Sequence, residues 1–407
     1  MSKGEDGRRQ FIDPHALLRR LAALPRRVAG TAGERETLRL LEDTLRGVGA
    51  SVALEPFYAP RTYLPMIWWA SGLLVASLML AAPGHWLWPL IALVVLWGAL
   101  RYFDWRWSWL IALPPWVKGH NLTARLPQHE RAPRRLILMA HYDAAPVSFA
   151  YRRNQVKRFR ETLLLSVAVM ALAALVVVMA SLGWRHPALL WARYGLGLAL
   201  LAQALVASID FWRYGYSPAV NDNASGVAAA MAVAERLWRA AREDAAGTWS
   251  VELVLTGAEE AGMIGAQRWL DRHRHELSPE TCFLINIDTV GAGDLKLVAR
   301  TGTLSTLTYA NPLMTMAQAL ADKEVRFHGV TLATHRVADF DSVWFARAGL
   351  PALTLAAYDG DGLMPHIHRP EDRLEAITPQ TIDQSIAFAT ALGLRLMQGP
   401  ICGVGDV

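Results

Sequence analysis

Residues 135–143 read Arg-Leu-Ile-Leu-Met-Ala-His-Tyr-Asp, an apolar run that ends in two polar side chains, His141 and Asp143. A short apolar run bounded by polar residues is typical of a buried strand. The stretch therefore predicts a strand that carries an imidazole and a carboxylate at its carboxyl end.

Two further apolar runs have the same form. Residues 251–256 precede Glu259 and Glu260, and residues 283–287 precede Asp288. In open parallel α/β sheets, ligands bind in the crevice beyond the carboxyl ends of the strands. We therefore predict an α/β fold, doubly wound around a mainly parallel sheet with flanking helices, in which three strands direct acidic or imidazole groups to one place.

Residues 221–226 and 368–372 add further side chains of the types that bind metals. Zinc takes His nitrogens and carboxylate oxygens, and a catalytic zinc keeps one position open for water. A two-zinc site needs two His and at least three carboxylates as ligands, with one more carboxylate free as general base. Each motif alone is a weak signal, but the order and context of all five make a two-zinc hydrolase the leading interpretation.

In this order the motifs resemble peptidase family M28, a family of zinc aminopeptidases. The family pattern runs His-x-Asp, Asp-Asn-x-x-Gly, Glu-Glu, Asp, and a late His followed by x-x-x-Asp. The resemblance extends to residues 26–34, 121–127, 341–345 and 349–352, and so covers the chain outside its apolar segments. It implies the zinc-peptidase type of α/β fold.

The resemblance implies five metal ligands: His141, Asp222, Glu260, Asp288 and His368. Asp222 would bridge two zinc ions, with His141 and Asp288 on one and Glu260 and His368 on the other. Glu259 would be the general base. Asp143 would accept a hydrogen bond from the imidazole of His141 and fix its tautomer, a positioning role rather than a ligand role.

The last ligand has an alternative, because His366 and His368 are two residues apart and would point the same way in an extended segment. We favour His368, since Asp372 follows it at the family spacing. Arg369 stands where the family has a small hydroxyl residue, so contacts to the substrate are expected to differ there. We expect four other His residues to be solvated: His273, His275, His328 and His335. Of these, His335 is the first that we would reassign to the substrate cleft.

Four apolar segments are the second large feature of the chain. They are residues 64–82, 86–100 with an extension through Tyr102 and Phe103, 163–182 and 188–209. A membrane span needs about 20 apolar residues, and Trp is enriched at membrane interfaces. We predict about four transmembrane helices in two hairpins; the alternative is a buried helical hairpin in a soluble protein.

These segments divide the chain into five parts. They are an amino-terminal part of the peptidase domain (1–63), a first transmembrane hairpin (64–103), a peptidase segment with the first ligand (104–150), a second hairpin (151–215) and the rest of the peptidase core (216–407). The second hairpin interrupts the peptidase domain between His141 and Asp222. We therefore expect it to lie near the mouth of the active site and to anchor the crevice at the membrane surface.

Charge indicates which side of the membrane the catalytic part occupies. Ten Lys and Arg residues flank the spans on that side, whereas the hairpin tips hold only Arg185 and Arg193. Cytoplasmic loops carry the Lys/Arg excess, which favours the cytoplasmic face of a bacterial-type inner membrane. Residues 1–10 are charged and lack an apolar stretch, so we expect no cleavable signal peptide. Many members of the family are exported proteins, which favours the opposite, non-cytoplasmic face of the membrane.

Composition excludes other classes. The chain has 407 residues, a net charge of +5, a sequence pI of about 9.3 and two cysteines, Cys282 and Cys402. Two cysteines rule out a disulfide framework. The basic residues cluster beside the apolar spans, where anionic lipid head groups account for them, so a nucleic-acid partner is not expected.

The sequence thus predicts a membrane-anchored, two-zinc aminopeptidase that removes N-terminal residues from peptides with a free amino terminus. One alternative is a glutaminyl-peptide cyclase, since those enzymes resemble the family and use one zinc. Another is a catalytically inactive, peptidase-like membrane receptor. Amidase or carboxypeptidase-like chemistry is a further option, because the specificity pocket cannot be identified from sequence.

Overall fold

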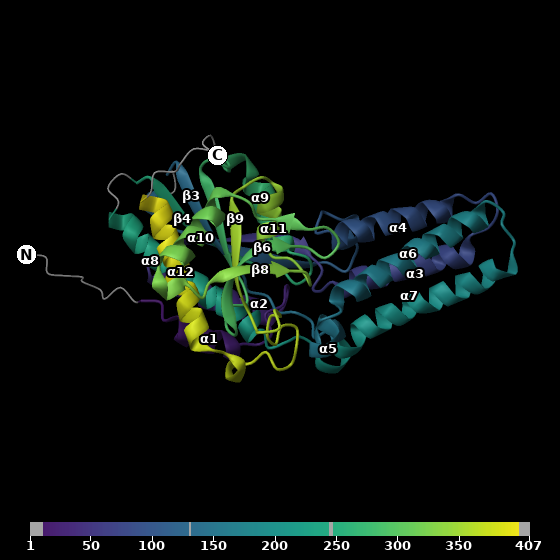
Figure 1. The fold of residues 1–407 in the computed structure, drawn as a ribbon, viewed down its shortest axis with the longest axis horizontal. Helices are drawn as coiled ribbons and strands as arrows, with labels where there is room; N and C mark the ends of the chain where they lie inside the picture. The colour runs from purple at the N-terminus through teal and green to yellow at the C-terminus, as the bar shows by residue number, and fades with distance from the viewer. Residues whose placement is uncertain (1–10, 130–131, 244–246, 399–407) are drawn as a thin grey trace, which may run out of the picture.

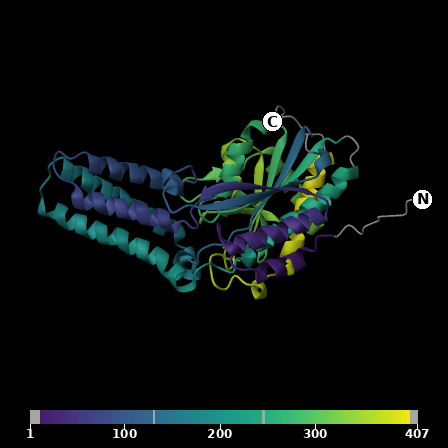
Figure 2. The same ribbon diagram turned by 180° about the vertical axis from the view of Figure 1, so that it is seen from behind.

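The computed structural model describes residues 11–129, 132–243 and 247–398. Residues 1–10 and Cys402 lie outside the described residues. The described chain forms two visibly different bodies, an α/β domain and a rod of four long helices that projects from one end of it (Figure 1). Seen from behind, the four helices again run side by side away from the sheet (Figure 2).

The described residues form one nine-stranded sheet with the order β1-β2-β4-β3-β5-β9-β6-β7, and β8 pairs with β6. Its strands are β1 (Ser51–Ala59), β2 (Val117–Arg125), β3 (Arg134–His141), β4 (Trp249–Thr256), β5 (Cys282–Ile287), β6 (Asp294–Thr301), β7 (Leu307–Thr308), β8 (Thr331–His335) and β9 (Ala352–Tyr358). The three strands predicted from the apolar runs are β3, β4 and β5. The α/β fold and its strands are confirmed.

The sheet is mixed, which corrects the expectation of a mainly parallel one. The four central strands β4, β3, β5 and β9 are parallel to one another. The pairs β1–β2, β2–β4 and β6–β9 are antiparallel.

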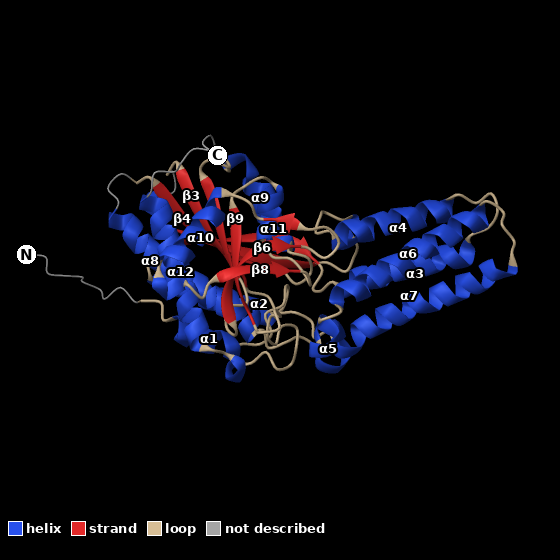
Figure 3. Cartoon of the chain, in the orientation of Figure 1, coloured by secondary structure: helices blue, strands red, loops and turns tan. Residues whose placement is uncertain are grey.

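Helices cover both faces of this sheet (Figure 3). The larger core cluster joins the sheet to α1 (Pro14–Ala23), α2 (Ala32–Gly47), α8 (Gly226–Glu243), α10 (Pro312–Lys323) and α12 (Pro379–Gln398). A second cluster joins it to α9 (Ile264–His273) and α11 (Ser342–Arg347) through Trp269 and Phe345. The central strands are consequently buried on both sides, which is why they are continuous apolar runs.

The rod contains α3 (Leu64–Leu80), α4 (Leu87–Phe103), α6 (Phe159–Ser181) and α7 (Pro187–Tyr214), and a short α5 (Arg153–Val156) lies at its base. The helices form two antiparallel hairpins, and the two tips touch where Gly84 N–H donates to the carbonyl of Ser181 over 3.0 Å. Of the described helices, α6 and α7 are long and apolar enough to cross a membrane. Helices α3 and α4 have 17 residues each and fall short of that test. Four spans are therefore not shown, because only the second hairpin has full-length helices.

Candidate metal centre

The predicted ligands converge at the carboxyl edge of the central parallel strands. His141 is the last residue of β3, Asp288 directly follows β5, and Glu260 lies in the loop after β4. Asp222 lies in a short turn, η4 (Val220–Ser225), before α8, and His368 lies in the loop after β9. All five side chains are held at the crevice position that the fold class favours for ligands.

One group of ligand atoms forms around His141. Its Nε2 lies 3.2 Å from Oδ1 of Asp222 and 3.7 Å from Oδ1 of Asp288. One nitrogen and two carboxylate oxygens at these separations can surround a single cation.

A second group forms around His368. Its Nε2 lies 3.1 Å from Oε2 of Glu260 and 3.5 Å from Oδ2 of Asp222. Asp222 therefore presents one carboxylate oxygen to each group, as a bridging ligand would. Oε1 of Glu260 is buried and has no hydrogen-bond partner among the described residues, so the donor set has room for a cation. The residues fit a pair of zinc ions in type, number and arrangement.

Asp143 and Glu259 lie beside the two ligand groups that share Asp222. The Asp143 carboxylate accepts hydrogen bonds from the backbone N–H groups of Glu259 (3.0 Å) and Glu260 (3.2 Å) and lies 3.5 Å from Nδ1 of His141. It therefore orients both the imidazole and the Glu259–Glu260 loop. Oε2 of Glu259 lies 3.9 Å from Nε2 of His141, and this side chain lines the cavity that the site opens into.

The electrostatics of the site indicate an excess of buried negative charge. Burial alone would lower the pKa of His141, yet the carboxylates of Glu259 and Asp288 outweigh it and hold that pKa well above its usual value. Burial, reinforced by Asp222, raises the pKa of Glu260 well above normal. Burial likewise raises the pKa of Glu259, with His141 opposing the shift. Buried carboxylates that raise the pKa of the imidazole and of one another form a cluster whose negative charge a cation would neutralise.

Two buried charges support the turn that carries Asp222. The Asp372 carboxylate accepts from the backbone N–H groups of Asn221 (2.6 Å) and Asp222 (3.1 Å), and burial raises the pKa of Asp372 to about 7. Arg27 is fully buried and donates to the carbonyls of Tyr142 (2.7 Å) and Ala219. These contacts explain two parts of the sequence pattern that do not reach the metal ligands: the acid four residues after His368 and the early Arg.

Gly226 closes the same motif for a steric reason. A Cβ at this position would lie 2.1 Å from Oδ1 of Asn223 and 2.4 Å from the carbonyl of Ile287. Only glycine lets the start of α8 approach the end of β5 this closely, and that approach brings Asp222 beside Asp288.

The structure places His368, and not His366, beside the other ligands. The ring of His368 stacks on Tyr151, with centroids 3.9 Å apart and planes 10° apart. Its carbonyl accepts from the backbone N–H of Ser148 over 3.1 Å. His366 is half-buried and lies outside the two ligand groups.

Of the His residues expected to be solvated, His335 is buried and lines the cavity, where burial lowers its pKa to about 4. His273 pairs with Glu55 at 3.1 Å and stacks on Trp269. His275 and His328 are exposed. His275 and His328 are therefore solvated as predicted, His273 is half-buried, and His335 lies in the cavity, as its predicted reassignment has it.

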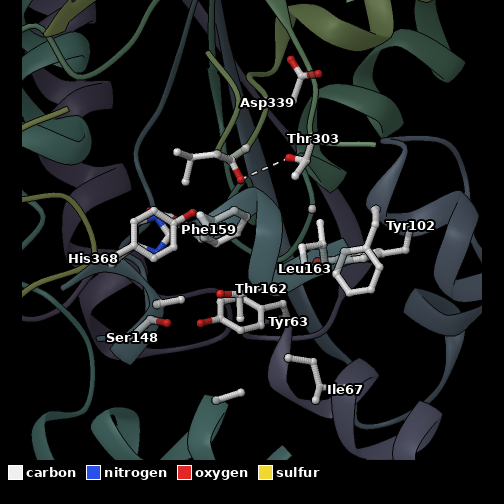
Figure 4. Close-up of a pocket in the computed structure, with 18 of the residues that line it drawn as sticks. Tyr63, Ile67, Tyr102, Ser148, Phe159, Thr162, Leu163, Thr303, Asp339 and His368 are labelled. Carbon is white, nitrogen blue, oxygen red and sulfur yellow. Dashed lines mark hydrogen bonds and ion pairs between the residues drawn. The ribbon is translucent and has the colours of Figure 1, made fainter. Parts of the chain in front are cut away.

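A cavity of about 490 Å³ opens from the metal centre toward the rod (Figure 4). Close to the candidate metal centre, Tyr63 is half-buried and hydrogen-bonds Ser148, and burial of its hydroxyl raises its pKa to about 12. Figure 4 shows its hydroxyl facing Ser148, with His368 on the same side of the cavity. Sequence reasoning missed Tyr63 and Tyr151, because both reach the site only through the packing of the rod against the α/β domain.

Comparison with known proteins agrees with this geometry. Residues 204–392 match the model of peptidase family M28. The resemblance to this family is confirmed. A curated M28-family relative is Aminopeptidase YwaD of Bacillus subtilis (strain 168), 25% identical over 178 residues. That match covers 43% of this chain and 37% of the relative, so the chain spans well under half the length of the relative it matches.

Solved structures share the fold of this chain. Glutaminyl cyclase of Porphyromonas gingivalis superposes with a TM-score of 0.53 at 14% identity, covering 94% of this chain and 97% of that one. A Zn-dependent exopeptidase from Parabacteroides distasonis gives 0.52 at 13% identity, covering 95% and 98%. The LapA aminopeptidase of Legionella pneumophila gives 0.51 at 12% identity, covering 94% and 70%. At these identities the likeness concerns the fold.

Proposed function

We propose that this chain is a membrane-anchored, zinc-dependent aminopeptidase that hydrolyses N-terminal residues from peptides. One observation carries the proposal: two adjacent ligand groups share Asp222, and the free carboxylate of Glu259 lies beside them. The match to peptidase family M28 and the aminopeptidase relative support the same reaction class.

Five residues would hold two zinc ions: His141, Asp222, Glu260, Asp288 and His368. Bound zinc supplies a Lewis acid for the amide carbonyl and lowers the pKa of a coordinated water. Glu259 takes the proton of the attacking water at its carboxylate and later delivers it to the departing amine. A raised pKa suits this role, because a carboxyl group with a pKa nearer neutrality can both accept and return a proton.

Asp143 positions this machinery rather than reacting. Its two oxygens hold the backbone of Glu259 and Glu260 while one faces Nδ1 of His141. Asp143 therefore holds the proposed base, Glu259, and two proposed ligands, His141 and Glu260, in place. Loss of Asp143 would displace Glu259 and both ligands together, which is the behaviour expected of an outer partner of a metal site.

The rod is the proposed membrane anchor. Exposed Trp residues gather near both ends of its helices, with Trp86, Trp184 and Trp191 toward the tips and Trp69 and Trp212 toward the α/β domain. Two aromatic belts separated by apolar side chains are the pattern of a bilayer-spanning segment. We propose that all four helices enter the bilayer, with the shorter α3 and α4 packed against α6 and α7.

We further propose that the α/β domain faces the cytoplasm, on the basis of the Lys/Arg excess around the base of the rod. A single cysteine introduced at exposed Arg185 in the tip, in a background lacking Cys282 and Cys402, tests the orientation. Labelling of intact cells by a membrane-impermeant maleimide supports a cytoplasmic domain. Labelling only after the cells are opened reverses the assignment.

A glutaminyl-peptide cyclase is the second candidate, because glutaminyl cyclases are among the solved structures with this fold. Cyclisation of an N-terminal Gln releases ammonia and leaves the peptide length unchanged, whereas hydrolysis releases the first residue. Mass analysis of a Gln-initiated peptide after incubation separates the two. The bridging arrangement of Asp222 favours the two-metal hydrolase.

The experiment that tests the proposal compares free and N-acetylated aminoacyl fluorogenic amides with purified, zinc-loaded protein. We expect cleavage of the free-amine substrates alone, its loss on chelation and its recovery on adding zinc. Failure to cleave any of them after zinc loading would remove the aminopeptidase assignment and favour the cyclase or an inactive receptor.

A further inference from the structure

The cavity at the metal centre continues far into the rod. One end is lined by His141, Asp222, Glu259, Glu260 and His368. The other end is lined by Met66 and Ala70 of α3, Ala99 of α4, Met170 of α6 and Leu200 of α7. We call the part between these four helices the bundle channel. A single cavity thus joins a charged metal centre to an apolar interior.

The bundle channel is long. Phe159 and Met170 both line it and are eleven residues apart on α6, which corresponds to roughly 16 Å along a helix axis. The whole cavity, including the part at the metal centre, has a volume of about 490 Å³. Apolar side chains line the channel over this length, which suits an extended hydrocarbon chain.

Three residues of α6 and α7 line the cavity and are also exposed, which indicates a lateral opening between the two helices: Thr162, Ala202 and Val206. Large apolar side chains surround the opening on the outer face of the rod, including Leu165, Leu205 and Ile209. An aqueous ligand gains nothing from such a rim, whereas a hydrocarbon chain in the surrounding bilayer could enter through it.

We propose that the bundle channel binds the hydrocarbon chain of an amphiphilic substrate whose amide group reaches the metal centre. This inference rests on the proposed amide hydrolysis and names its substrate class. The amide C–N bond breaks, the hydroxyl of water adds to the carbonyl carbon, and the proton passes to the departing nitrogen. The chain lies along α6 and α7 while the head group faces Glu259 and the ligands.

Chain length is the variable that tests the inference. Zinc-loaded protein is assayed with two series of free-amine substrates, each used below its critical micelle concentration. One carries n-alkyl groups of two to ten carbons on the leaving amine, and the other carries them on the aminoacyl side chain. Full burial of each methylene from water strengthens binding by up to about fourfold, so we expect kcat/KM to climb with length in one series and then level off.

Obstructed channels provide the matched comparison. Ser166→Phe fills a half-buried lining position of α6, and Ala202→Phe narrows the lateral opening from an exposed position that tolerates bulk. Ala168→Phe places the same side chain on the outer, exposed face of α6 as the control. We expect the first two variants to flatten the dependence of kcat/KM on length, and the control to retain the wild-type slope.

The outcomes separate this inference from the proposed function. Hydrolysis of the shortest substrates with no gain on lengthening would overturn the chain-binding role and leave the aminopeptidase intact. An equal slope in wild type, Ser166→Phe and Ala202→Phe would also overturn it, since the gain would then arise from partition into detergent. Absence of hydrolysis across both series would defeat the proposed function and the inference with it.

Discussion

The α/β domain and the rod place their large apolar side chains differently. In the domain, large apolar residues such as Trp238 and Trp269 are inside, and their indole N–H groups are hydrogen-bonded. In the rod, many of the buried positions are small, including Ala92, Ala173 and Ala204. Many large apolar residues of the rod are exposed, among them Leu90, Leu172, Leu175, Leu198 and Leu205.

The difference follows from the solvent that each part is built for. Water drives large apolar side chains inward, whereas a bilayer is as apolar as leucine and lets small residues bring helix backbones together. If the rod were in water, these leucines would form an exposed apolar surface that is unusually large for a soluble protein. The comparison therefore predicts that polar substitutions harm the two parts by different mechanisms.

The largest expected effect is in the domain, where chemistry depends on one carboxylate. Glu259→Gln should lower kcat by roughly 10²–10⁴-fold, because it removes proton transfer while preserving shape. Zinc content, measured by elemental analysis, and the melting temperature should match wild type. Substantial residual turnover in this variant would take the general-base role away from Glu259.

A smaller but still large effect is expected at the last ligand. His368→Ala should weaken zinc binding by more than the roughly 10–100-fold that an outer partner contributes, because a nitrogen ligand beside Glu260 is lost. His366→Ala, two residues away, is the matched control and should retain zinc. Titration with a competing chelator measures both. Equal losses in the two variants would contradict the assignment of His368.

The rod is tested at Leu172, which is exposed near the middle of α6. In a bilayer, Leu172→Lys should disfavour insertion by about 3 kcal/mol. We expect less protein in alkali-washed membranes and normal behaviour for Leu172→Phe. If the lysine variant were instead more soluble and fully folded, the rod would be facing water and the contrast between the two parts would fail.

The smallest effect concerns the pH dependence of stability in the domain. Burial raises the pKa of Asp339 from 3.8 to about 7, where its carboxylate accepts from Thr301 (3.0 Å) and from the backbone N–H of Phe340 (2.9 Å). The folded state then holds this proton more tightly than the unfolded state, so stability declines as the pH rises from about 4 to about 7.

Asp339→Asn should remove that decline. The melting temperature of the variant relative to wild type should therefore be higher at pH 8 than at pH 5. Thermal unfolding of both proteins across this range measures the difference. A constant difference would show that Asp339 titrates normally in the folded protein.

Much of the candidate metal centre could be predicted from the chain because its proposed ligands follow recognisable strands. His141 ends one apolar run, Asp288 follows a second, and Glu259 and Glu260 follow a third. Apolar runs of this length predict buried strands, so these side chains are expected at one edge of the sheet. His368 lies in a loop, and only the family spacing separated it from His366. The antiparallel edges of the sheet escaped prediction because pairing direction depends on which strands become neighbours.

The α/β class, the candidate metal-ligand side chains and the four apolar helices could be predicted from the chain alone, because each depends on local periodicity or on ordered motifs. The arrival of Tyr63, Tyr151 and His335 at the candidate metal centre, and the course of the cavity between the helices of the rod, follow only from tertiary packing. Tyr151, for example, stacks on His368, a residue far along the chain, and these side chains carry no local pattern that distinguishes them. The physical reason is that a channel is the space left by packing, and packing is a property of surfaces that meet only after the chain has folded.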